Sequence, residues 1–481
     1  MSRTDDLEPR LRAYLARAAA WGEEHASRRS RMADPSPSRG TRLLTVISAF
    51  AVAAVVATVL AVGVSLRNHR ETTPSVGAVE PPAVSSSPCP AAAVRPVTPD
   101  RGTLIALKML SLHTGWLAVT YFAPDSSGDL PGGSERVFRT IDCGHSWTDV
   151  TPQQLATRSR DGIITLTAVD SRHAWIATWV QNGTPTVAEI WRTSDGGASW
   201  ERTDVQLRPQ GNLSLFFLDR DRGWMAATVS GDRSKNNLKA RLYSTTDGGA
   251  SWTEVRSDAS DGTVPVAAIA FLDRDHGWGV PEPTFGGDLY YTGDGGRSWS
   301  RRAIPSPDGF GGLVQAIGLP TFTDTRDGVL PVRLGSASVP FPRPGQPAAA
   351  RFDLYVTHDG GESWTPTTPL ADVPAVSAWT TPPSYGVLSA THWVVTTESA
   401  MYTTMDAGRN WRAVSSTMGL PPQRGPLYPS VVVVAGAFPT DTAWWVVYEY
   451  LGCTEGCSTY GILRTVDGGQ TWVENEPPTP T

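Results

Sequence analysis

Short runs of alternating apolar and polar residues fill the chain from about Gly102 onward, and tight turns rich in Gly and Asp separate them. Such alternation is typical of β-strands that bury one face. The runs come in sets of four, and the whole set is repeated seven times. Repeats of this kind predict an all-β fold, a seven-bladed β-propeller of four-stranded blades.

One turn recurs in every repeat with the pattern Thr-x-Asp-x-Gly-x-x-Trp, and its seven Trp residues lie 53, 52, 47, 65, 47 and 61 residues apart. An Asp carboxylate can accept hydrogen bonds from backbone N–H groups and a Thr hydroxyl, while Gly supplies a conformation with positive φ. We therefore expect a structural turn between the third and fourth strands of each blade. The seven turns contain Thr140, Asp142, Gly144 and Trp147; Thr193, Asp195, Gly197 and Trp200; Thr245, Asp247, Gly249 and Trp252; Thr292, Asp294, Gly296 and Trp299; Thr357, Asp359, Gly361 and Trp364; Thr404, Asp406, Gly408 and Trp411; and Thr465, Asp467, Gly469 and Trp472.

This turn resembles the Asp-box, or bacterial neuraminidase repeat, of sialidases, sortilin-type receptors, some glucanases and the photosystem II assembly-factor propellers. All seven copies keep the Thr, Asp, Gly and Trp of the pattern. In those families the box is an architectural turn, so the resemblance implies a structural role for these Asp residues. The blade count and the regular boxes look most like the assembly-factor propellers, which implies a scaffolding role for envelope proteins but not photosynthesis.

Strand order divides the loops of each blade between two ends. The turns between first and second strands must share one end with the Asp-boxes, and the remaining loops must lie at the other. The box end is uniform, whereas the other end has long loops at residues 122–135, 335–352 and 449–460. Because binding residues gather in variable loops on a rigid frame, we expect the binding face opposite the boxes, near blades five, seven and one.

The chain before the propeller has a different composition. Residues 5–27 space their apolar side chains as in an amphipathic helix, which would dock on a cytoplasmic partner or lie on the inner leaflet. Residues 43–66 are twenty-four positions without a charge, enough for a helix to cross a bilayer. The expected parts are a cytoplasmic segment with the amphipathic helix (1–42), a transmembrane helix (43–66), a Pro-rich stalk (67–101), the propeller (102–476) and a tail (477–481).

Charges beside the uncharged stretch predict its orientation. Five Arg residues lie within residues 28–42, against Arg67 and Arg70 after the stretch, and positive residues favour the cytoplasmic side. We expect a single-pass protein of the cell membrane with a cytoplasmic N-terminus and an extracytoplasmic propeller; a signal peptide is the alternative. A transmembrane dimer would be permitted by a stripe of small side chains, namely Ala49, Ala53, Ala57, Ala61 and Ser65.

The formal net charge of −6 is unevenly distributed. Residues 1–70 carry eleven Arg against six acidic residues, so the remainder carries thirty basic against forty-one acidic residues, a net charge of −11. Affinity for nucleic acid comes largely from basic side chains that meet phosphates. The acidic propeller therefore predicts no nucleic-acid partner.

All four cysteines follow the uncharged stretch, on the side where disulfides persist. Cys453 and Cys457 bracket a three-residue loop and are expected to pair. That pairing leaves Cys89 and Cys143, whose bond would fasten the stalk to blade one, although spacing alone allows three pairings. Zinc is the weaker alternative because the CxxxC motif has no second Cys/His pair nearby. We expect no metal and no other cofactor.

A sialidase would need three arginines, a Tyr nucleophile with a Glu partner, and an Asp acid. The Arg-Ile-Pro signature of that family is absent, and Tyr448 and Glu449 are neighbours on a predicted strand, where they point to opposite faces. Hydrolysis by two carboxylates stays open because several acidic residues lie on predicted loops, namely Asp125, Asp129, Asp232 and Glu282.

The sequence assigns no catalytic residue. We expect a membrane-anchored extracytoplasmic propeller that binds or assembles envelope proteins. An envelope carbohydrate-binding protein or a glycosidase, sialidase-like or glucanase-like, is the alternative.

Overall fold

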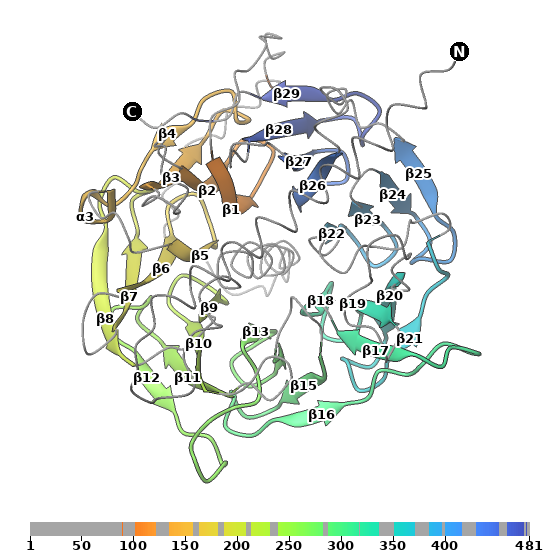
Figure 1. Cartoon of the computed structure of the whole chain (residues 1–481), viewed down its shortest axis with the longest axis horizontal. Helices are drawn as coiled ribbons and strands as arrows, with labels where there is room; N and C mark the ends of the chain where they lie inside the picture. The colour runs from red at the N-terminus through yellow and green to blue at the C-terminus, as the bar shows by residue number, and fades with distance from the viewer. Residues whose placement is uncertain are drawn as a thin grey trace, which may run out of the picture. The chain divides into compact units, whose positions relative to one another are not determined.

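The computed structural model describes residues 89, 102–121, 134–156, 163–180, 187–207, 213–230, 239–281, 287–316, 318–335, 351–370, 384–396, 400–415, 430–451, 459–475 and 478. They form seven antiparallel sheets in the arrangement of a seven-bladed propeller (Figure 1). The predicted all-β fold with four-stranded blades is confirmed.

Blades one to four each contain four strands in sequence order. Blade one is β1 (Gly102–Met109), β2 (Gly115–Tyr121), β3 (Ser134–Thr140) and β4 (Thr148–Asp149), followed by the short helix α3 (Gln153–Ala156). Blade two is β5 (Ile163–Ala168), β6 (Ala174–Val180), β7 (Val187–Thr193) and β8 (Glu201–Gln206). Blade three is β9 (Leu213–Phe217), β10 (Gly223–Ser230), β11 (Lys239–Thr245) and β12 (Thr253–Val255). Blade four is β13 (Ala268–Phe271), β14 (Gly277–Val280), β15 (Leu289–Thr292) and β16 (Ser300–Arg302).

Blade five differs because its inner strand is split. Two short strands, β17 (Leu313–Ala316) and β18 (Thr321–Phe322), both pair with β19 (Gly328–Gly335), followed by β20 (Arg351–Thr357) and β21 (Thr365–Pro366). Pro320 lies at the interruption, where a residue without an N–H group cannot continue the ladder. Blade six is β22 (Ser384–Val387), β23 (Trp393–Thr396), β24 (Met401–Thr404) and β25 (Arg412–Ser415). Blade seven is β26 (Ser430–Ala437), β27 (Trp444–Leu451), β28 (Thr459–Thr465) and β29 (Val473–Asn475).

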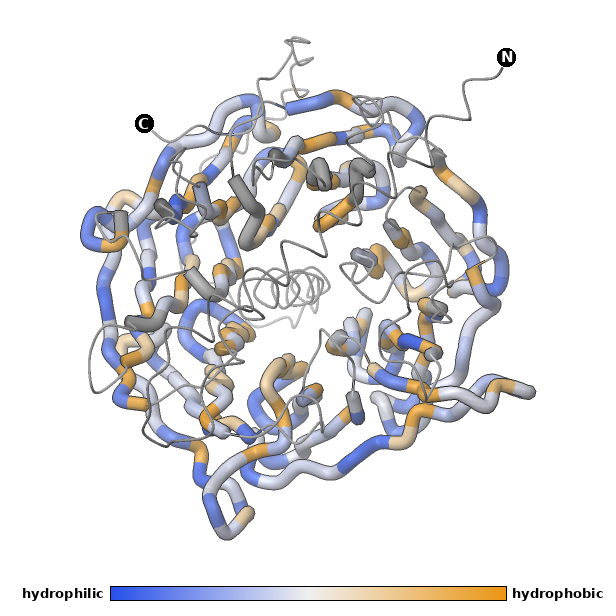
Figure 2. Tube along the Cα trace, in the orientation of Figure 1, coloured by the Kyte–Doolittle hydropathy of each residue, from blue (hydrophilic) through white to orange (hydrophobic). Residues whose placement is uncertain are grey.

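Burial decreases from the first strand of a blade to the fourth. Strands β9 and β13 are buried at every position, whereas β12 and β16 hold only exposed or half-buried residues. Hydrophobic and hydrophilic residues are interspersed along the blades (Figure 2). Large rings near the start of the second strands fill the space between blades, and the fully buried ones are Trp116, Trp175, Trp278, Trp393, Trp444 and Trp445.

The ring closes between blades seven and one without a shared strand, because each blade is one continuous stretch of chain. One buried cluster joins Leu107 and Leu117 of blade one to Trp445 of blade seven. Two side chains of blade seven donate across the seam: Arg464 to the carbonyl of Cys143 at 3.1 Å, and Asn475 to the same carbonyl at 3.1 Å and to that of Gly144 at 2.6 Å. The seam is therefore held by side chains rather than by a strand ladder.

Replacing Asn475 tests this closure. Asn475→Ala is expected to lower the free energy of unfolding by about 1–3 kcal/mol, because a buried carbonyl loses its donor. Urea unfolding measures the change, and Gln470→Ala, an exposed residue of the same blade, is the control. An equal effect of the two substitutions would contradict a closing role for Asn475.

Among the described residues no helix is long and apolar enough to cross a membrane. The helices predicted at residues 5–27 and 43–66, and the stalk apart from Cys89, lie outside the described residues. The tail is described only at Pro478, whose carbonyl accepts a hydrogen bond from the Tyr121 hydroxyl of blade one.

Candidate functional site

The seven repeated turns are alike in detail, and we number their positions one to eight from Thr to Trp. In each, the Thr hydroxyl donates to Oδ1 of the Asp at position three, over 2.7–2.9 Å. The Thr hydroxyl oxygen in turn accepts the N–H of the Gly at position five, over 2.8–3.0 Å. The Thr hydroxyl is thus the centre of the turn.

Position seven supplies a donor pair that the sequence pattern left undefined. Its N–H donates to Oδ1 of the Asp over 2.8–3.0 Å, and its side chain donates to Oδ2 over 2.5–2.6 Å. The signal was present in the sequence, because every residue at this position is small and polar: Ser146, Ser199, Ser251, Ser298, Ser363, Asn410 and Thr471. Both carboxylate oxygens are therefore occupied within the turn.

Two consecutive residues of each turn adopt positive φ, not the Gly at position five alone. Position four is Gly in five turns, but it is Cys143 in blade one, with φ 65°, and Ala407 in blade six, with φ 58°. Its N–H donates to a carbonyl of the turn between the first and second strands in all seven blades, over 2.8–3.1 Å. These bonds place both sets of turns at the same end of the blades, as strand order predicts. We call it the turn end.

The turn carboxylates are strongly acidic. The Ser199 hydroxyl and N–H hold the pKa of Asp195 at about 2, and the Ser251 hydroxyl does the same for Asp247. Hydrogen bonds from position seven likewise hold the pKa of Asp359 and of Asp406 at about 2. A carboxylate that stays ionised and already accepts several donors is a poor proton donor or base near neutral pH. In these four turns the carboxylate therefore acts as a hydrogen-bond acceptor for its own turn.

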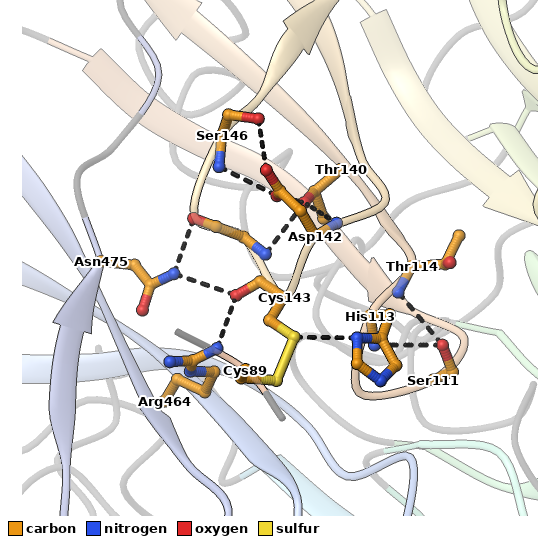
Figure 3. Close-up of a disulfide and its surroundings, with 11 residues drawn as sticks. Cys89, Ser111, His113, Thr114, Thr140, Asp142, Cys143, Ser146, Arg464 and Asn475 are labelled. Atoms are coloured by element: carbon orange, nitrogen blue, oxygen red, sulfur yellow. Dashed lines mark hydrogen bonds between the residues drawn. A yellow bond between two sulfur atoms is a disulfide. The ribbon is translucent and has the colours of Figure 1, made fainter. Parts of the chain in front are cut away.

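A disulfide joins Cys89 to Cys143 at the turn of blade one, beside the blade seven seam (Figure 3). His113, from the first-to-second turn of the same blade, places Nδ1 2.9 Å from the Cys143 sulfur. The two sulfurs and the imidazole lie within 4.8 Å of one another, but sulfurs joined in a disulfide are not thiolate ligands for a metal. Cys453 and Cys457 lie outside the described residues.

A small polar pocket of about 160 Å³ opens at the turn end between blades two and three. Arg192 of blade two reaches across it, donating to the Asp247 carbonyl at 3.0 Å and pairing with Glu201. Arg220 and Asp221 of blade three also line it. The lining therefore holds both cationic and anionic side chains, with Arg192 and Glu201 already paired to each other.

The long loops predicted to bind lie mostly outside the described residues, as do Asp125, Asp129, Asp232 and Glu282. Tyr448 donates its hydroxyl to Glu474, a pair that sequence reasoning missed because the two residues come from different strands. The Tyr448 side chain is only 2% exposed, so it cannot serve as a nucleophile for an external substrate.

Comparisons with known proteins find one family model over part of the chain. The Sortilin-Vps10 family model, described as "Sortilin, neurotensin receptor 3", matches residues 135–275, which lie in blades one to four. None of the curated proteins compared with the chain matches it.

Similar solved structures include YCF48 bound to D1 peptide, at 18% identity over 65% of this chain and 80% of that chain, with a TM-score of 0.39. YCF48 from Cyanidioschyzon merolae is 14% identical over 75% and 96% of the two chains, with a TM-score of 0.43. The GH74 xyloglucanase from Xanthomonas campestris is 15% identical over 79% and 70%, with a TM-score of 0.35. At these similarities the neighbours carry no assignment of activity, and function has to be inferred from the residues of this chain.

Proposed function

We propose that this chain is an Asp-box propeller anchored by one membrane span, with its N-terminus in the cytoplasm, and that it binds or assembles envelope proteins outside the membrane. The uncharged residues 43–66 and the Arg residues before them support the anchor and its orientation. The eight-position turn, repeated seven times with the same hydrogen bonds, supports membership of the Asp-box propellers.

One observation carries the proposal of binding rather than catalysis. In all seven turns both carboxylate oxygens of the Asp at position three accept hydrogen bonds from donors of the same turn. The seven Asp residues of the repeated turns therefore help to hold the blades in shape, and their carboxylates are not available to a substrate. A rigid frame with variable loops at its other end is suited to partner recognition.

Crosslinking of the full chain in its native membrane, followed by mass spectrometry, tests the proposal. We expect a specific envelope protein, lost when residues 336–350 are replaced by a Gly/Ser segment of equal length and kept when the exposed Thr246 at the turn end is replaced by Ala. Recovery of only non-specific neighbours in both variants would overturn the assembly role.

Glycan binding is the second candidate, and the polar pocket between blades two and three favours it. A glycan array of the full chain in detergent, with Arg192→Ala as the variant, separates the two. Saccharide binding that Arg192→Ala abolishes would support the glycan function and contradict a role limited to protein partners.

The orientation has its own test. A protease added to intact cells is expected to degrade the propeller and to leave a tag at the N-terminus intact. Degradation of the tag with protection of the propeller would mean that the span is inverted.

A further inference from the structure

Three exposed apolar side chains lie at the same position of three neighbouring turns. Ile141 of blade one, Met405 of blade six and Val466 of blade seven all occupy position two, and they are 63%, 67% and 47% exposed. Leu313 is the only other large apolar side chain that is comparably exposed within the described residues. Position two of blades two to five holds smaller or polar residues instead, namely Ser194, Thr246, Gly293 and His358.

The first-to-second turns change character at the same boundary. In blades two to five they contain twelve charged residues: Asp170, Arg172, Asp219, Arg220, Asp221, Arg222, Asp273, Arg274, Asp275, Asp324, Arg326 and Asp327. In blades six, seven and one they contain a single charged residue, Asp441. In blades six, seven and one the exposed apolar residue at position two therefore lies beside a first-to-second turn with few or no charges, although the repeated turns keep their own Asp142, Asp406 and Asp467 and the exposed Arg409. We call these three turn pairs the apolar sector of the turn end.

The chain that precedes the propeller is covalently linked to it in this sector. Cys89 is bonded to Cys143, which stands two residues after Ile141. Strand β1 runs toward the turn end, so without the disulfide the preceding chain would join the propeller at the opposite end. The Cys89–Cys143 disulfide therefore brings the point at which the preceding chain is attached to the propeller over to the turn end.

The same bond shortens the tether. Between Leu66 and Cys89 lie 22 residues, against 35 between Leu66 and Gly102. At about 3.1 Å per residue for an extended Pro-rich chain, the maximal reach falls from roughly 110 Å to roughly 70 Å. A shorter tether raises the effective concentration of the fastened sector at the surface to which the tether leads.

We propose that the turn end of blades six, seven and one rests on the outer surface of the lipid bilayer, with Ile141, Met405 and Val466 in the boundary between headgroups and acyl chains. This inference rests on the membrane anchor proposed above. Apolar side chains at the tips of a rigid surface gain from leaving water at such a boundary. The sector has no cluster of Lys or Arg, so neutral lipid suffices. The opposite end, with its variable loops, is then directed away from the membrane.

Fluorescence in proteoliposomes tests the contact. The full chain, carrying an environment-sensitive fluorescent amino acid at position 405, is reconstituted in phosphatidylcholine with and without brominated acyl chains. The matched control carries the same probe at position 246, position two of blade three. We expect blue-shifted emission and quenching by brominated lipid at 405, several-fold more than at 246. Removal of the Cys89–Cys143 disulfide by the C89S/C143S double substitution should lower the quenching at 405.

The other outcomes separate this inference from the anchor. A chain that floats with the vesicles but is quenched equally weakly at both positions overturns the contact and leaves the anchor intact. A chain that does not float overturns the anchor itself. A photocrosslinking residue at 405 that captures a protein rather than lipid in native membranes overturns the contact in favour of a protein interface. If quenching at 405 is unchanged in the C89S/C143S variant, the Cys89–Cys143 disulfide does not orient the propeller on the membrane.

Discussion

Trp278→Ala is expected to lower the free energy of unfolding by about 3–5 kcal/mol, the range for deleting a large buried ring. Trp278 is 2% exposed and packs between blades four and five, with its ring centroid 4.5 Å from that of Phe322 and 5.3 Å from that of Tyr291. Its ring also lies against Gly361, where a Cβ would come within 2.9 Å of Nε1. The alanine variant would therefore loosen one blade interface rather than one blade. Chemical denaturation at neutral pH measures the loss.

Two further variants separate packing from hydrogen bonding. The Nε1 of Trp278 has no hydrogen-bond partner among the described residues, so Trp278→Phe should keep a larger share of the stability than Trp278→Ala. Trp299 of the repeated turn is only half-buried and packs edge-on against Phe271, so Trp299→Ala should cost less. If Trp299→Ala proves as costly as Trp278→Ala, the second-strand rings are not the main contacts between blades.

The number of blades and the shared end of the two turn sets could be predicted because each depends on local sequence. A turn of eight residues specifies its own hydrogen bonds, and strand order alone assigns it to one end. Position four was harder to foresee. Gly occupies it in five turns, but Cys143 and Ala407 hide the need for positive φ, and the need follows from a bond to another turn of the blade.

Features that depend on several blades could not be predicted from the sequence. The pairing of Tyr448 with Glu474, and the reach of Arg464 to the Cys143 carbonyl, join residues whose distance along the chain gives no sign of contact. The exposure of Ile141, Met405 and Val466 on three neighbouring blades likewise depends on how the blades pack around the ring.

Acid is expected to destabilise the propeller cooperatively between about pH 4 and pH 2. The pKa of Asp195, Asp247, Asp359 and Asp406 is about 2, below the ordinary value of 3.8, mainly because the position-seven side chain donates to each carboxylate. A carboxylate whose pKa is lower when folded stabilises the fold above its unfolded pKa. That stabilisation is lost as the pH falls through the folded pKa. These turns belong to four different blades of the same propeller, so the four losses of stabilisation add together in one folded ring.

A double variant, Ser199→Ala with Ser251→Ala, gives the sharpest test of this acid dependence. Without those hydroxyls the pKa of Asp195 and of Asp247 should rise toward its ordinary value. The variant should therefore be less stable at pH 7 and lose less stability than the parent chain between pH 5 and pH 2. The matched control is Ser194→Ala with Thr246→Ala, at exposed positions two of the same turns, and it should follow the parent at every pH. Urea unfolding at pH 7, 5, 3 and 2 measures all three proteins. Parallel pH profiles for the two double variants would show that the turn carboxylates do not govern acid stability.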